Sequence, residues 1–195
     1  MIKIGINGFG RIGRLILRAL LENYKDQIQV VAINDLGSIE ANAHLVKYDS
    51  THGTLPYDVE TSKDGFKILN QNIKVFAERD PANLPWGKEG VDVVLECTGL
   101  FLDKISAEKH IKAGAKKVII SAPAKDVDFT IVQGVNSKDL KKEHNVISNG
   151  SCTTNCLAPV AMVLEKNFGI EYGYMTTIHS YTGDQKLLDT LHKDL

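Results

Sequence analysis

A cysteine at the start of a predicted helix has the clearest capacity for covalent chemistry in this sequence. Cys152 lies in the segment 148–156, which runs from the end of a short apolar strand into a helix. The positive end of a helix dipole stabilises a thiolate, and backbone N–H groups in the same turn can stabilise a developing oxyanion. The neighbouring hydroxyls of Ser151, Thr153 and Thr154 suit a phosphate group. The segment therefore predicts a nucleophilic thiol at Cys152, with a buried and inert cysteine as the alternative.

The two other cysteines carry weaker signals. Unpaired cysteines are among the most buried residues and are usually inert, so we interpret Cys97 and Cys156 as core residues. No metal site is expected, because C-x-x-x-C stands here without a second pair of ligands. Three cysteines do not make a disulfide framework, and the N-terminus lacks the apolar run of a signal peptide. A cytoplasmic protein is therefore expected.

A histidine is placed where it could serve as the base for Cys152. His179 ends a predicted strand, 172–179, that follows the Cys152 helix. Functional side chains gather at strand ends at the mouth of a sheet. The residues by themselves leave a catalytic and a structural role for His179 equally open.

A glycine motif near the N-terminus indicates dinucleotide binding. Residues 8–13 read Gly-Phe-Gly-Arg-Ile-Gly and fit G-x-G-x-x-G, directly after a strand and at the opening of a helix. Asp35 follows 22 residues after Gly13, at the end of the next strand. Gly8 permits the tight turn, Gly10 lets the backbone approach a pyrophosphate, and Gly13 allows close packing of helix on strand. The alternative is a glycine-rich turn that binds nothing, with Asp35 as a loop cap.

The carboxylate of Asp35 also predicts which dinucleotide is bound. A carboxylate at this position hydrogen-bonds the adenosine ribose hydroxyls and would repel a 2′-phosphate. Leu36, where an NADP-binding protein could carry a basic residue, agrees with this. The sequence thus favours NAD over NADP.

Strands alternate with helices over most of the chain, and this pattern predicts a Rossmann-type, doubly wound parallel α/β sheet. Short antiparallel strands are expected around Val59, at 67–69 and at 74–76. The other expected strands are 2–7, 30–34, 91–97, 117–121, 129–132, 146–148 and 172–179. The expected helices are 11–23, one from an N-cap at Ser38 toward Tyr48, 106–113 and 152–167.

Two domains are expected: an NAD-binding Rossmann domain over residues 1–150, and the incomplete start of an α+β catalytic domain over 151–195. The formal net charge of −1 gives no electrostatic drive toward nucleic acid or a membrane surface. No apolar run reaches transmembrane length. A small molecule or another subunit is the expected partner.

Five blocks of sequence resemble one enzyme family. In chain order they are 7–14 (NGFGRIGR), 48–53 (YDSTHG), 78–81 (ERDP), 151–156 (SCTTNC) and 176–179 (TTIH). Together they resemble phosphorylating glyceraldehyde-3-phosphate dehydrogenase, and the match runs along the whole chain. Two positions depart from the family pattern: Gly150 stands where alanine is usual, and Leu191 where proline is common.

The resemblance implies roles for individual residues. Cys152 would attack the aldehyde and His179 would act as the base, which leaves a thioester that inorganic phosphate cleaves. Glyceraldehyde 3-phosphate and inorganic phosphate are the implied substrates. Residues implied to hold NAD are the backbone at Arg11 and Ile12, with Asp35, Arg79 and Ser121. Those implied to contact substrate or phosphate are Ser151, Thr153 and Thr182.

Without the resemblance, the better interpretations would be a surface ion pair for Arg79, with Glu78 or Asp80, and a plain loop hydroxyl for Thr182. Family members continue beyond residue 195, so we expect a fragment that is inactive alone and a homotetramer for the full-length form. The alternatives are an erythrose-4-phosphate dehydrogenase or a non-catalytic dinucleotide-binding module.

Overall fold

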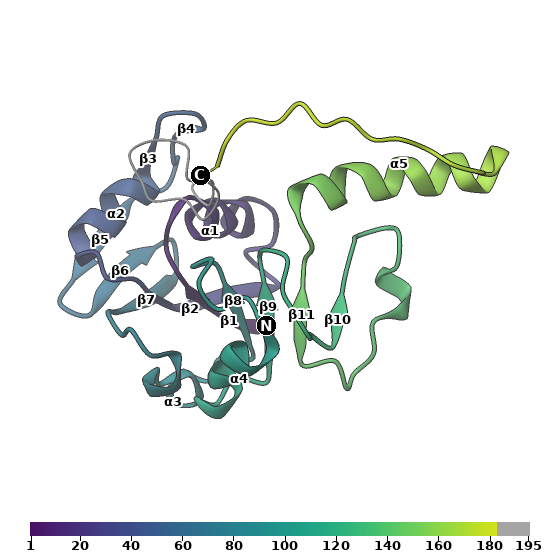
Figure 1. Cartoon of the computed structure of the whole chain (residues 1–195). Helices are drawn as coiled ribbons and strands as arrows, with labels where there is room; N and C mark the ends of the chain where they lie inside the picture. The colour runs from purple at the N-terminus through teal and green to yellow at the C-terminus, as the bar shows by residue number, and fades with distance from the viewer. Residues whose placement is uncertain (183–195) are drawn as a thin grey trace, which may run out of the picture.

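A nine-stranded sheet forms the centre of the molecule in the computed structural model, which describes residues 1–182 (Figure 1). From one edge to the other its strands are β10 (Phe129–Thr130), β11 (Val146–Ser148), β9 (Lys117–Ile120), β8 (Val93–Glu96), β1 (Ile2–Asn7), β2 (Ile28–Asn34), β7 (Gln71–Phe76), β6 (Gly65–Ile68) and β5 (Val59–Ser62). Neighbouring strands from β10 to β7 are parallel, and the last three form an antiparallel meander. The predicted Rossmann-type α/β fold is confirmed.

Helices connect the parallel strands and cover both faces of the sheet (Figure 1). The helices α1 (Arg11–Asn23) and α2 (Ile39–Lys47) lie on one face, and α3 (Trp86–Glu89) and α4 (Lys104–Lys112) lie on the other. The chain leaves β1 toward β2 on one side and returns to β8 on the other side of β1. The carboxyl ends of these three strands therefore surround the switch point of the sheet, where ligands bind in such folds.

Smaller elements complete the described fold. A short hairpin of β3 (Tyr48–Asp49) and β4 (Gly53–Thr54) follows α2, and the 3₁₀ turns are η1 (Pro81–Asn83) and η2 (Ser137–Asp139). The sequence analysis did not predict this hairpin or α3. Ser38 caps α2 as predicted, since its hydroxyl accepts a hydrogen bond from the Ala41 N–H at 3.1 Å.

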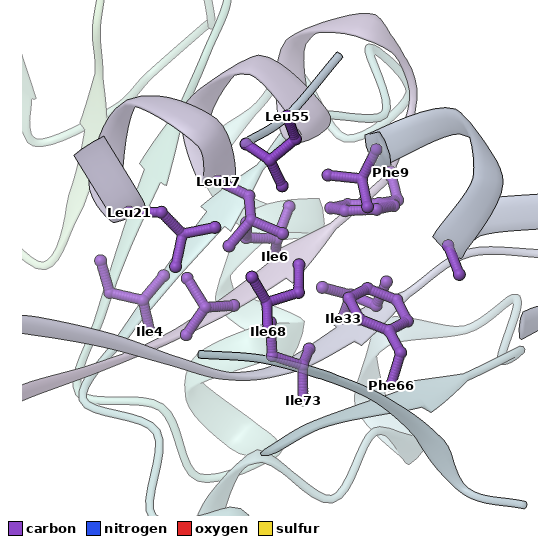
Figure 2. Packing of buried hydrophobic residues seen from close by; sticks show 13 residues of the cluster. Ile4, Ile6, Phe9, Leu17, Leu21, Ile33, Leu55, Phe66, Ile68 and Ile73 are labelled. Atoms are coloured by element: carbon purple, nitrogen blue, oxygen red, sulfur yellow. The ribbon is translucent and has the colours of Figure 1, made fainter. Parts of the chain in front are cut away.

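Each face of the sheet has its own hydrophobic core. Under α1 and α2, side chains from β1, α1 and the meander interdigitate, among them Ile6, Leu17 and Phe66 (Figure 2). On the opposite face, Trp86 packs with residues of β8, α4 and β9. Burial on both faces explains why the central strands are nearly continuous runs of branched apolar residues.

The last described helix, α5 (Cys152–Phe168), extends away from the sheet (Figure 1). Most of its apolar side chains are exposed, and Cys156 is exposed with them, so the prediction that Cys156 is a core residue is wrong. The physical reason is that nothing among residues 1–182 covers that side of α5.

Residues 169–182 return along α5 as an extended segment (Figure 1). The predicted strand at 172–179 is wrong for the described part of the chain, because no neighbouring strand there offers it hydrogen-bond partners. Leu191 lies outside the described residues. None of the described helices is long and apolar enough to cross a membrane.

Candidate active site

The glycine loop between β1 and α1 has the close packing that its sequence predicts. Gly8 takes a φ of +88°, and a Cβ atom there would lie 2.7 Å from the backbone nitrogen of Thr98. A Cβ atom on Gly13 would lie 2.3 Å from the carbonyl oxygen of Gly8. Around Gly10, by contrast, a Cβ atom would meet nothing within 4 Å. The loop is therefore tight against the protein and open at Gly10, the side from which an anion can approach the start of α1.

Asp35 follows β2 and braces this loop. Its Oδ2 accepts a hydrogen bond from the backbone N–H of Phe9 at 2.9 Å, and its Oδ1 accepts one from the N–H of Gly37 at 2.9 Å. The side chain is only half-buried, so the carboxylate also faces the adjoining cleft. The loop-cap alternative and the ribose-binding interpretation both fit this geometry.

A cleft of roughly 370 Å³ opens at the carboxyl ends of β1, β2 and β8. It includes Gly8 and Gly10 of the loop, Asp35 and Leu36 after β2, and a wall formed by the segment after β8. Its full lining is Asn7, Gly8, Gly10, Asn34, Asp35, Leu36, Glu78, Arg79, Cys97, Thr98, Leu100 and Phe101. Asp35, Glu78 and Arg79 are the charged residues of this lining, and the others are neutral.

Arg79 lines this cleft after β7. Among the described residues neither nearby carboxylate forms an ion pair with it: Asp80 pairs with Lys109 at 3.1 Å, and Glu78 accepts a hydrogen bond from the Asp80 N–H. The surface ion pair considered for Arg79 is therefore absent from this part of the chain. Its guanidinium remains available to the cleft.

Three other residues expected to hold the cofactor, Arg11, Ile12 and Ser121, are not among those that line the cleft. Ile12 is exposed at the start of α1. The Arg11 guanidinium contacts Asp49 at 2.8 Å, and this contact, with backbone N–H groups, holds the pKa of the Asp49 carboxyl far below its usual range. Ser121 follows β9, and its N–H donates to the carbonyl of Glu96 at 3.0 Å. The exposed Arg11 side chain is thus paired with Asp49, which leaves the backbone of Arg11 for an anion.

The nucleophile candidate is the first residue of α5. Ser151 caps this helix, since its hydroxyl accepts from the Thr154 N–H at 2.9 Å. Cys152 is exposed, and contacts from His179 and from the backbone and hydroxyl of Thr153 lower the pKa of its thiol. The preceding Gly150 has a φ of +67°, a conformation that favours glycine, so glycine suits the turn into α5.

The extended segment 169–182 brings His179 back to the start of α5. The Nε2 atom of His179 lies 3.1 Å from the Sγ atom of Cys152. The Nδ1 atom faces the carbonyl oxygen of Ser180, which can only accept, so Nδ1 carries the hydrogen. In that tautomer Nε2 presents a lone pair to the thiol, which is the arrangement a general base requires.

The remaining predicted site residues have simpler surroundings. Thr182 lies three positions beyond His179 on the same extended segment. The Ser151 hydroxyl also shares a hydrogen with the Thr154 hydroxyl at 2.8 Å. Cys97 packs beside the core and lines the cleft, and burial raises the pKa of its thiol to about 12. Its raised pKa keeps Cys97 a neutral thiol at neutral pH, and its packing beside the core agrees with its predicted structural role.

Sequence reasoning missed a polar network beneath the cleft. Glu96 and His110 are both fully enclosed, and Asn7 and Asn34 join them from the ends of β1 and β2. A charged residue at the end of an otherwise apolar strand, as Glu96 is, was the available signal. Among the described residues no group of histidine, cysteine or acidic side chains could hold a metal ion.

Comparison with known proteins gives this geometry a family. The family model described as "Glyceraldehyde 3-phosphate dehydrogenase, NAD binding domain" matches residues 2–104, more than half of the chain. The chain belongs to the glyceraldehyde-3-phosphate dehydrogenase family. The model of the family's C-terminal domain matches residues 151–195. The resemblance found in the sequence motifs is thus confirmed, and NAD is the cofactor of the family's N-terminal domain.

Individual members of the family are similar along the whole chain. The chain is 57% identical over 195 residues to the glyceraldehyde-3-phosphate dehydrogenase of Pseudomonas aeruginosa and 58% identical over 195 residues to that of Streptomyces coelicolor. It is 57% identical over 194 residues to the enzyme of Xanthobacter flavus. All three alignments cover 100% of this chain, and the chain spans 58% of the length of each relative.

Proposed function

We propose that this chain carries the nucleophile, the base and the NAD site of a glycolytic dehydrogenase that converts glyceraldehyde 3-phosphate and inorganic phosphate to 1,3-bisphosphoglycerate. The observation that carries the proposal is the 3.1 Å contact between Cys152 Sγ and His179 Nε2. The names of the relatives support the choice of substrate. The open glycine loop and Asp35 support the cofactor half of the site.

The first stage forms and oxidises a covalent adduct. His179 Nε2 takes the thiol proton, and the Cys152 sulfur attacks the aldehyde carbon to form a C–S bond. The proton passes from His179 to the new oxyanion, which gives a thiohemiacetal. His179 takes that proton back when the hydride leaves the same carbon, and a thioester remains on Cys152. NAD, when bound, supplies the hydride acceptor for this stage.

The second stage transfers the acyl group to phosphate. An oxygen of inorganic phosphate attacks the thioester carbonyl, and the C–S bond breaks. The leaving group is the Cys152 thiolate, which the start of α5 stabilises. We assign the phosphate contacts to Ser151, Thr153 and Thr182. The product is an acyl phosphate, so the oxidation energy is conserved in it.

We assign a role in NAD binding to each residue expected at the cofactor site. The glycine loop and the start of α1 bind the pyrophosphate, Asp35 binds the adenosine ribose, and Arg79 and Ser121 hold the rest of the dinucleotide. The loop residues concerned are Gly8, Gly10, Arg11, Ile12 and Gly13. We further propose that the full-length form is a cytoplasmic homotetramer, which light scattering of that form tests.

Protection of Cys152 from alkylation tests the substrate assignment without requiring turnover. We expect glyceraldehyde 3-phosphate to slow iodoacetamide labelling of Cys152, because the thiohemiacetal occupies its sulfur. Labelling of the exposed Cys156 provides the internal control. Glycerol 3-phosphate, which lacks the aldehyde, should protect much less. Equal labelling with both compounds would contradict the proposal.

The same assay separates the alternatives. Stronger protection by erythrose 4-phosphate than by glyceraldehyde 3-phosphate would favour an erythrose-4-phosphate dehydrogenase. A chain that binds NAD but labels Cys152 no faster than Cys156 would be a non-catalytic dinucleotide-binding module.

A further inference from the structure

Glu96, the last residue of β8, is a carboxylate buried beneath the NAD cleft with 1% of its surface exposed. Its Oε2 accepts from Asn7 Nδ2 at 2.6 Å and lies 2.9 Å from His110 Nε2. Its Oε1 accepts from the Thr98 N–H at 2.8 Å and from the Thr98 hydroxyl. An ionised carboxylate offers about four acceptor positions. Four donors from three residues therefore occupy all the acceptor positions of the Glu96 carboxylate, and we call these donors its shell.

Trp86 determines which nitrogen of His110 carries the hydrogen. The indole Nε1 is a donor only, and it lies 2.9 Å from His110 Nδ1, so Nδ1 must accept. The hydrogen is therefore on Nε2, which donates it to Glu96. Both the Trp86 and His110 side chains are completely buried. His110 is thus a neutral imidazole with one fixed orientation and a donor directed at the carboxylate.

The partners of Glu96 also form part of the cleft. Asn7 and Thr98 both line it. The Thr98 hydroxyl accepts from the Leu100 N–H at 3.1 Å, and Asn7 Oδ1 accepts from Asn34 Nδ2 at 2.7 Å. Through these bonds Glu96 fixes the ends of β1 and β2 and the turn after β8. These three segments, together with Asp35 and the glycine loop, form the walls of the cleft.

We propose that Glu96 is a positioning residue for NAD. It holds Asn7 and the turn at 98–100 in the arrangement that receives the adenosine half of the cofactor. His110, oriented by Trp86, supplies the donor that completes its shell. A carboxylate suits this place because no uncharged side chain accepts from four donors. The inference rests on NAD binding in the cleft and is independent of the reaction proposed at Cys152.

Adenosine monophosphate (AMP) is the probe that tests this proposal, because its binding requires neither Cys152 nor the nicotinamide. In Glu96→Gln the amide adds two donors and removes acceptors, so at least one existing donor faces an N–H group. We expect Glu96→Gln to weaken AMP binding by about tenfold or more in isothermal titration calorimetry. Asp92→Asn is the matched control, because Asp92 lies at the opposite end of the same strand, where its carboxylate accepts from the backbone N–H of Lys3 and from Lys116 Nζ.

We expect AMP affinity in Asp92→Asn to stay within about twofold of the unsubstituted chain. Equal AMP affinity in folded Glu96→Gln and Asp92→Asn would overturn the proposal. Thermal melts and the emission of Trp86, the only tryptophan of the chain, report whether each variant is folded.

If Glu96→Gln does not fold, a second pair of variants tests the positioning role of Glu96. Glutamine at position 110 keeps an N–H donor toward Glu96, whereas leucine of similar size removes it. We expect His110→Gln to retain AMP affinity within about threefold and His110→Leu to lose about tenfold. Equal affinities in the two would count against a positioning role.

One measurement needs no substitution. The ¹⁵N chemical shifts of His110 in the unsubstituted chain should show hydrogen on Nε2 and a bare Nδ1. A hydrogen on Nδ1 would overturn the proposal, because Trp86 and Glu96 could not then hold the ring as described.

Discussion

The carboxylate of Asp35 accepts a hydrogen bond from the backbone N–H of Phe9 at 2.9 Å, which ties the end of β2 to the glycine loop. One side chain therefore shapes the loop and faces the cleft with a negative charge. Because that charge would repel a 2′-phosphate, we expect the chain to bind AMP roughly tenfold or more tightly than 2′,5′-ADP, about 1.4 kcal/mol or more. Calorimetric titration with the two nucleotides measures the difference.

Asp35→Asn separates the two tasks of this residue. Asparagine keeps one oxygen that can accept from the Phe9 N–H, but it loses the second oxygen, which accepts from the Gly37 N–H, and the charge. The contact with Phe9 should therefore hold while the preference for AMP over 2′,5′-ADP decreases. If 2′,5′-ADP stays equally disfavoured in this variant, the carboxylate is not the source of the selectivity.

Gly13 and Gly10 should respond differently to alanine. In Gly13→Ala the new Cβ atom would lie 2.3 Å from the Gly8 carbonyl oxygen, so α1 and β1 must separate. We expect a loss of about 1–3 kcal/mol in the free energy of unfolding, the range typical of overpacking. Urea denaturation measures it.

Gly10→Ala is the matched substitution, because its Cβ atom meets no protein atom within 4 Å. We expect a stability change of no more than about 1 kcal/mol, since Gly10 is the N-cap of α1. NAD affinity should fall, because the methyl group occupies the approach of the pyrophosphate. Unchanged NAD binding in Gly10→Ala would place the pyrophosphate elsewhere.

Asp128 should make the stability of the fold depend on acid pH. Burial raises the pKa of its carboxyl, but Lys104 at 2.6 Å and the N–H groups of Val146 and Asn145 outweigh this and lower the pKa to about 2. A lowered pKa means that the contribution of Asp128 is complete above its ordinary pKa of 3.8 and is lost as the pH falls toward 2.

Denaturation midpoints between pH 6 and 2 test this, with Asp128→Asn as the comparison. The unsubstituted chain should be more stable at pH 6, and the two curves should converge as the pH approaches 2. Parallel curves over that interval would show that the ion pair between Lys104 of α4 and Asp128, which precedes β10, does not have this effect.

Most of the Rossmann part of the fold was predictable because local patterns and tertiary packing agree there. The apolar strands β1, β2, β8 and β9 are buried on both faces, and Ser38 caps its helix with its own hydroxyl. The region after Cys152 was not predictable in the same way. A strand needs a neighbour, and alternation in residues 172–179 indicates an extended backbone without showing what pairs with it.

The site residues also differ in how far local sequence patterns could identify them. Short-range patterns identify the glycine loop, Asp35 and Cys152, because their chemistry depends on a turn or a helix start. The contact between Cys152 and His179 joins residues 27 positions apart, and the resemblance, not periodicity, indicated it. The hydrogen-bond donors to Glu96 come from β1, from α4 and from the turn after β8, so no single local pattern could reveal them.

Turnover by the 195-residue chain itself is a separate expectation. Cys152 and His179 are both exposed, so nothing among residues 1–182 shields a thioester at this position from bulk water. We expect no detectable NADH when the chain is mixed with glyceraldehyde 3-phosphate, phosphate and NAD. Steady NADH formation that Cys152→Ser abolishes would contradict this.

The pH dependence of Cys152 alkylation tests the central claim most directly, namely that His179 activates this thiol. Peptide mass spectrometry can follow the reaction of all three cysteines with iodoacetamide. We expect Cys152 to react about tenfold or more faster than the exposed Cys156 at pH 7, and Cys97 to stay unmodified. In His179→Ala the Cys152 profile should move to higher pH. Equal rates at Cys152 and Cys156, unaffected by His179→Ala, would contradict the account.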